Sequence, residues 1–124
     1  MKPTRLLRLR RIAEAEVSRT LRRLPPALRQ EAERLPVTFE ERPNDATVAD
    51  GIDPDVLGLF VGPPYESEGV ADVPAQIILY LANLWDFAGG DEDIFREEVR
   101  TTYLHELGHY LGLDEEDLDL RGLL

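Results

Sequence analysis

The sequence predicts an α+β domain in which helices and strands are segregated along the chain. Apolar residues at helical spacing come first, short apolar runs follow, and a long helical segment comes last. This order differs from the alternation of strands and helices that is typical of a parallel sheet. A chain of 124 residues can bury one core but not two, so we expect a single domain over residues 1–124.

The N-terminal part, residues 5–34, is predicted to be helical and basic. Over residues 5–24, apolar side chains recur at spacings of three and four, which indicates an amphipathic helix. Pro25 and Pro26 end this helix and begin a shorter one over about 26–34.

The middle of the chain has the composition of a small sheet. Strands are expected at 37–41, 56–61 and 74–81, with polar loops at 43–55 and 63–73 and room for a fourth strand at 46–52. Gly58 inside the second run indicates either a bulge or close packing against a helix.

The last third of the chain is predicted to be mostly helical. Residues 83–90 are ambiguous, and their large apolar side chains are expected to cover the core: Leu84, Trp85 and Phe87. Asp91 is a suitable N-cap for a long helix through Leu111, and Gly112 suits the left-handed residue that ends such a helix.

The composition limits the partners and the kinds of site. Without cysteine, a metal site must use His, carboxylates and water. No apolar run approaches the ~20 residues of a transmembrane span, and arginines interrupt the N-terminal apolar residues, which argues against a secretory signal. We therefore expect a cytoplasmic protein with no membrane partner.

Charge is divided unevenly along the chain. Residues 1–34 carry ten Lys or Arg against four Glu, whereas residues 35–124 carry four against twenty-one acidic residues. The basic part is a candidate nucleic-acid surface, but the acidic remainder would repel phosphates. We therefore predict no nucleic-acid partner, and the sequence indicates no particular oligomeric state.

The functional motif is His-Glu-x-x-His at residues 105–109, which contains the only two histidines of the chain. On a helix, residues four apart share a face, so His105 and His109 can bind one metal ion. Glu106 lies roughly 100° round the helix from His105, close enough to hold a water on that metal. The pattern predicts a Zn²⁺ site with Glu106 as general base and then acid.

A catalytic zinc site normally has three protein ligands, so one more is needed. The candidates follow Gly112, which lets the chain leave the helix sharply and turn back towards the metal. Glu115 is the best-placed carboxylate and Asp114 is the alternative. Asp114 with Asp117 is also typical of an N-cap for a last helical turn, which would leave the other acids in solvent.

Other polar side chains have weaker claims on this site. Glu98 lies two turns before His105 and is either an acceptor for an imidazole N–H or, as we favour, the partner of Arg96 or Arg100. Donors to a developing oxyanion could come from three tyrosines that are more simply core aromatics: Tyr80, Tyr103 and Tyr110.

At residues 105–115 the chain resembles the zincin metallopeptidases, since HELGHYLGLDE is similar to H-E-x-x-H-x-x-G-x-x-[HD]. With its small size, it resembles the minimal zincin family of bacterial zincin-like metallopeptidases. The likeness extends to the Leu-Pro step at residues 24–25, to Leu-Gly-Leu-Phe-Val-Gly at 57–62 and to Pro-x-x-Ile-x-Leu-Tyr at 74–80. It also extends to the tail, which ends in acidic residues and Leu-x-x-x-Gly, here at 118–122.

The resemblance implies a small mixed sheet with the motif helix packed on it. It also implies zinc ligands at His105, His109 and Glu115, with Glu106 catalytic; the family usually has Asp where this chain has Glu115. The expected function is zinc-dependent hydrolysis of a peptide or protein substrate. The alternative is a zinc-binding regulatory or partner-binding module without peptidase activity, because a short chain has little protein from which to build specificity pockets.

Overall fold

The computed structural model describes residues 1–62 and 74–123, and within these ranges the fold is α+β as predicted. The predicted polar loop at 63–73 lies outside the described residues. The elements in chain order are α1 (Pro3–Arg23), α2 (Pro26–Ala32), β1 (Val37–Glu40), α3 (Asp45–Ala49), β2 (Gly58–Val61), β3 (Gln76–Tyr80), α4 (Leu81–Phe87), α5 (Glu92–Leu111) and α6 (Glu115–Leu120).

The three predicted strands form a mixed sheet in the order β1-β3-β2. β3 is the central strand and pairs in parallel with β1 and antiparallel with β2. Its alternating apolar residues are buried, with Ile77 and Leu79 at 0% exposure. β2 therefore has one side paired with β3 and the other side unpaired with any described strand.

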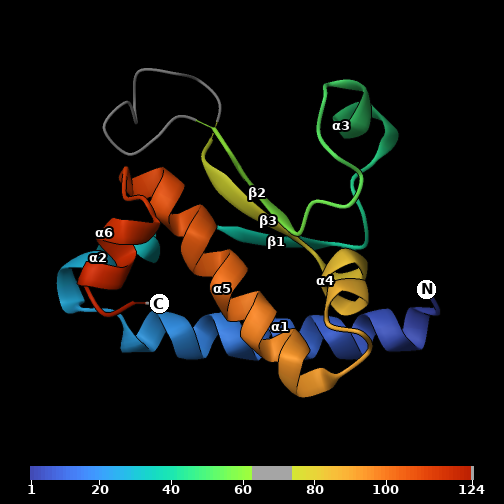
Figure 1. Cartoon of the computed structure of the whole chain (residues 1–124), viewed down its shortest axis with the longest axis horizontal. Helices are drawn as coiled ribbons and strands as arrows, with labels where there is room; N and C mark the ends of the chain where they lie inside the picture. Colours follow the sequence, from blue (N-terminus) through green and yellow to red (C-terminus); the bar gives the residue numbers. More distant parts are fainter. Residues whose placement is uncertain (63–73, 124) are drawn as a thin grey trace.

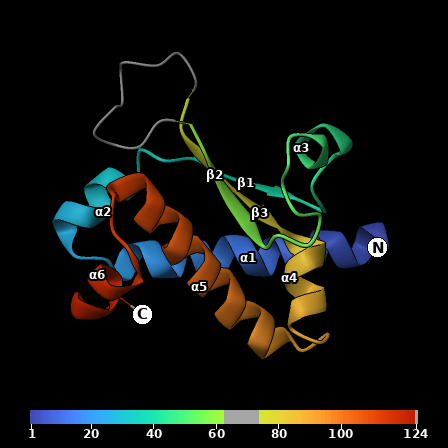
Figure 2. The same ribbon diagram turned by 45° about the horizontal axis from the view of Figure 1, so that its top comes forward.

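The long helix α5 packs against both the sheet and α1, and Figures 1 and 2 show it crossing α1. α1 crosses it and contributes the small and medium apolar residues Leu9, Ala13 and Val17, while α5 contributes Phe95 and Val99. The apolar stripe predicted for α1 is therefore the face that covers α5. This packing fixes α5 from both sides.

Gly58 lies where β2 packs closely against α5. A Cβ atom at this position would lie 2.8 Å from Cγ2 of Thr102 and 3.0 Å from the carbonyl oxygen of Ile78. Of the two readings of Gly58, close packing against a helix is therefore confirmed. The missing side chain allows the backbone of β2 to lie directly on the helix that carries the histidines.

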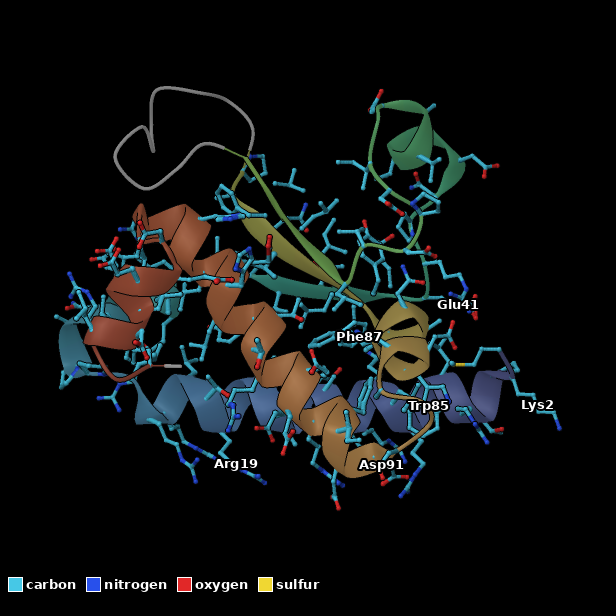
Figure 3. All side chains as sticks on the ribbon, viewed as in Figure 1. Lys2, Arg19, Glu41, Trp85, Phe87 and Asp91 are labelled. Carbon is cyan, nitrogen blue, oxygen red and sulfur yellow. The ribbon has the colours of Figure 1, made fainter. Side chains whose placement is uncertain are left out.

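Two expectations about the middle of the chain are wrong. Residues 45–49 form the short helix α3 within the predicted loop and in place of any fourth strand, because the Asn44 side chain accepts a hydrogen bond from the Thr47 N–H and caps it. Phe87, labelled in Figure 3, is 64% exposed at the end of α4 and does not cover the core. Leu84 and the partly buried Trp85 do, the latter beneath the guanidinium of Arg5.

The N-cap predicted at Asp91 is confirmed, since its side chain accepts hydrogen bonds from the N–H groups of Asp93 and Ile94 at the start of α5 (Figure 3). The segment left ambiguous at 83–90 begins in a helix, α4, which starts at Leu81 within the range expected for the third strand. No helix in the described part of the chain is both long and apolar enough to cross a bilayer.

Candidate metal centre

The residues of the His-Glu-x-x-His motif lie on the last two turns of α5. The histidine rings are neighbours, with centroids 4.6 Å apart and planes inclined at 62°. Donor atoms of His105, Glu106 and His109 all lie within 4.8 Å of one another, so these three residues could hold a metal ion. The histidines are partly open to solvent, whereas Glu106 is only 5% exposed.

Glu106 is a buried carboxylate in a largely apolar setting. Burial raises its pKa, while the nearby His105 and a hydrogen bond from the Phe60 backbone N–H act to lower it. Glu106 Oε1 also lies 3.4 Å from Nδ1 of His109. A carboxyl group with a raised pKa beside two imidazoles is suited to accept a proton and to release it again.

The bond from Phe60 follows from the pairing of β2. The Leu57 carbonyl accepts from the Tyr80 N–H, and hydrogen bonding alternates along an antiparallel strand. The N–H groups of Gly58 and Phe60 are therefore directed away from β3. The unpaired side of β2 thus supplies the backbone donor that acts to lower the pKa of Glu106.

The helix ends as predicted at Gly112, whose φ of 73° is left-handed. The Leu113 N–H donates to the Gly108 carbonyl at 2.8 Å, which turns the chain back along α5. Gly108 itself leaves no space for a side chain, since a Cβ atom there would lie 2.8 Å from the Leu113 carbonyl oxygen and 3.2 Å from Leu118. The tail is therefore packed directly on the motif helix.

The tail then forms α6, and its first residues take separate roles. Asp114 and Asp117 form a reciprocal capping box, each carboxylate accepting from the other residue's backbone N–H. This is the N-cap arrangement expected for Asp114. Glu115 lies instead beside the motif, with Oε1 3.4 Å from Nδ1 of His105. The structure thus brings Glu115 to His105, outside the group formed by His105, Glu106 and His109, and uses Asp114 in the backbone cap.

A cavity of about 730 Å³ lies over this cluster. Its walls come from α5, from the segment leading into β2 and from the C-terminal tail. The lining residues beyond the motif are mainly apolar or small, and include Val56, Leu57, Gly58, Leu59, Thr101, Thr102, Leu104 and Leu123. A smaller cavity of about 410 Å³ lies on the tail side of the histidines.

The other polar candidates are not part of the cluster. Glu98 lines the large cavity, but no hydrogen bond or ion pair joins it to any described residue, so its expected pairing with Arg96 or Arg100 is wrong. Arg96 pairs with acidic residues of the preceding turn. The three tyrosines are each about 1% exposed and line neither cavity, in agreement with the simpler expectation.

Sequence reasoning missed the backbone of Phe60 and the role of Gly108. Gly108 lies inside the motif. Glycine has a low helix propensity, so a glycine in a helix interior indicates that another segment packs closely against the helix at that position. That signal was present in the sequence. The sequence contains no comparable signal for the Phe60 N–H, because every residue except proline has a backbone N–H.

A family model described as zincin-like metallopeptidase matches residues 32–123, which is most of the chain. The chain belongs to this family. The matched range of this zincin-like protein includes the sheet, α5 and the tail, whereas α1 precedes it. No curated protein sequence matches the chain.

Membership of the zincin-like family implies a metal, typically zinc, and the residues present fit one. Two imidazoles and carboxylates are ligands that zinc accepts. Two donors at 2.0–2.1 Å from one tetrahedral ion lie roughly 3.4 Å apart. The 3.4 Å separation between His105 Nδ1 and Glu115 Oε1 is of this size, although Glu115 is not in the group of donors formed by His105, Glu106 and His109.

Proposed function

We propose that the protein is a zinc-dependent metallopeptidase that hydrolyses peptide bonds in a peptide or protein substrate. The observation that carries the proposal is the buried Glu106 carboxylate beside the His105 and His109 imidazoles, at the base of an open cavity. Family membership supports the same reading. We assign zinc binding to His105, His109 and Glu115.

When bound, zinc would polarise the substrate carbonyl and lower the pKa of water towards ~7. Glu106 takes the proton of the attacking water and passes it to the nitrogen of the leaving amine. Its raised pKa suits both steps, since a carboxyl group of ordinary acidity would return the proton less readily. The Phe60 N–H and the surrounding burial hold the carboxylate in place.

The unpaired side of β2 is the proposed binding edge for the substrate backbone. Gly58 directs its N–H and carbonyl away from β3, and an extended peptide can pair with such an edge as an added strand. Leu57 and Leu59 flank this position and line the cavity. A substrate bound there would lie across the motif, with apolar side chains against these leucines.

The decisive experiment replaces Glu106 with Gln and screens both proteins, loaded with zinc, against a library of internally quenched fluorescent peptides. We expect Glu106→Gln to retain zinc and to lose about 10²–10⁴-fold in kcat/KM, the usual contribution of a general base. If the zinc-loaded variant cleaves as well as wild type, the proposed mechanism is wrong. If neither protein cleaves any peptide while both hold zinc, the chain is a zinc-binding module.

A further inference from the structure

The large cavity over the metal centre adjoins a second one on the side of the C-terminal tail. The second cavity has a volume of about 310 Å³ and shares Arg100, Leu104 and Leu123 with the first. Its far side is formed by the C-terminal end of α1, including Arg23. A groove therefore extends from the histidines to a small hollow that both Arg23 and Arg100 line.

These two arginines have no acidic partner among the residues that the structure describes, unlike several other arginines of the chain. Arg8 pairs with Glu92, and Arg42 pairs with Asp86. Arg23 and Arg100 make no ion pair or hydrogen bond with any described residue, and both are exposed. Arg100 is also the one cation among the described residues that line the cavity over the metal centre.

The carboxylates of the same cavity do not neutralise Arg100. Glu98 is two residues away on α5, and residues two apart point to different sides of a helix. Glu106 is held by the Phe60 N–H beside His109, and Glu115 lies beside His105. The Arg100 guanidinium is therefore left with its donors available to a group that enters the groove.

We propose that Arg100, assisted by Arg23, binds a carboxylate of the peptide substrate. A guanidinium presents paired N–H donors that match the two oxygens of a carboxylate. The five residues from Arg100 to His105 span about 7.5 Å of helix. An extended peptide advances about 3.3 Å per residue, so the recognised group is two or three residues from the reacting bond. This inference rests on the proposed function, because it takes the ligand of the groove to be a peptide substrate.

The carboxylate has two sources, the C-terminus of a short peptide or an Asp or Glu side chain. Both are tested with fluorescein-labelled probes based on Ala-Ala-Leu-Ala-Ala, in which Leu provides an apolar side chain for the leucine-lined wall. The first probe has a free C-terminal carboxylate and the second ends in a C-terminal amide. The third also ends in an amide and has Glu in place of the fourth and last Ala. Binding to zinc-loaded Glu106→Gln protein is followed by fluorescence anisotropy, so no turnover is required.

We expect at least one carboxylate probe to bind about 10-fold more tightly than the neutral amide, as charge-assisted hydrogen bonds allow. Adding Arg100→Gln should remove this preference, and Arg100→Lys should retain part of it. The matched control is Arg11→Gln, at an exposed arginine of α1 that lines neither cavity. Zinc affinity and the urea midpoint should be the same in all of these proteins.

Preference for the free C-terminus alone identifies a terminal carboxylate, and preference for the Glu probe alone identifies a side chain. Equal binding of all three probes, no binding of any, or a preference that survives Arg100→Gln overturns the inference. Its failure is separable from that of the proposed function. If the protein binds the carboxylate probes selectively but zinc-loaded wild type cleaves no peptide, the proposed peptidase function is wrong. If wild type cleaves peptides but shows no preference for a carboxylate, only the proposed role of Arg100 is wrong.

Discussion

The candidate site has one carboxylate on each side of α5, and the two carboxylates are held in place by different means. On the β2 side, Glu106 is buried and accepts a hydrogen bond from a strand more than forty residues earlier in the chain. On the tail side, Glu115 is exposed and is positioned by the left-handed Gly112 and the capping box of α6. One carboxylate is held by tertiary packing and the other by bonds between sequence neighbours.

The difference bears on which role each carboxylate can take. A group that must gain and lose a proton benefits from burial, which raises its pKa and keeps it in one orientation. A group that binds a cation benefits from remaining ionised, which exposure favours. Because the two carboxylates are held by different contacts, a substitution can disturb one of them without disturbing the other.

The largest effect should follow from removing Glu115. We expect Glu115→Gln to lower zinc affinity by at least ~100-fold, because even residues that only orient metal ligands contribute ~10–100-fold. The measurement is a competition titration against a chromophoric chelator at fixed pH.

Asp114→Asn is the matched control on the same tail. Asn is as good an N-cap as Asp, so α6 should form and zinc affinity should change by less than ~10-fold. If Asp114→Asn lowers the affinity more than Glu115→Gln does, then Asp114 is the ligand and the two proposed roles are exchanged.

The next effect concerns the β2 side. Gly58→Ala would place a methyl group 2.8 Å from Thr102 Cγ2, and overpacking of this kind costs about 1–3 kcal/mol. The expected result is a lower urea midpoint with an unchanged denaturant slope. Peptidase activity should fall as well, because β2 moves away from Glu106.

Thr102→Ser tests the cause of that effect. The substitution removes Cγ2, so Gly58→Ala with Thr102→Ser should recover part of the lost stability, while contacts with Ile78 and Leu79 prevent full recovery. Strict additivity of the two substitutions would show that the close approach of β2 to α5 is not the reason that Gly58 is required.

The smallest expected effect is on stability without metal. Because burial raises the pKa of Glu106 above 4.5, the native state holds its proton to higher pH than the unfolded chain does. Stability of the metal-free protein should therefore fall as pH rises from about 4.5 through that raised pKa. Glu106→Gln should lack this component and be the more stable protein at pH 7, as measured by urea unfolding in a chelator.

Glu115→Gln is the exposed counterpart in the same experiment. Its side chain is 75% exposed, so its replacement should change the urea midpoint of the metal-free protein at pH 7 by little. A Glu106→Gln protein that loses stability at pH 7 relative to wild type would contradict the account of Glu106 as a buried, costly charge.

The comparison also explains what sequence reasoning could reach. The caps at Asp91 and Asp114 and the turn at Gly112 act within a few residues of their partners, so residue type and spacing predict them. The motif likewise needs only the period of a helix. The three strands were recognisable as apolar runs, but α3 was missed because its five residues depend on one Asn44 cap inside a polar segment.

What sequence reasoning did not reach depends on contacts between distant segments. The partner of Glu106 is a backbone N–H whose direction follows from the pairing of β2 with β3. The exposure of Phe87 depends on which face of α4 packs on the core, and a seven-residue helix has too little periodicity to show this. The assignment of Glu98 to an arginine assumed that nearest charges pair, whereas Arg96 pairs with Glu92 and Asp93 instead.

The crossing of α1 over α5 has a consequence for how the protein is made. The Arg8 and Glu92 side chains that join these helices are 84 residues apart in the chain. Synthesis proceeds from the N-terminus, so α1 leaves the ribosome well before the helix that covers its apolar face. Closing so long a loop slows folding, and until then the metal motif lacks the support that holds α5 against the sheet. The apolar face of α1 therefore stays uncovered until α5 has been synthesised and packs against it.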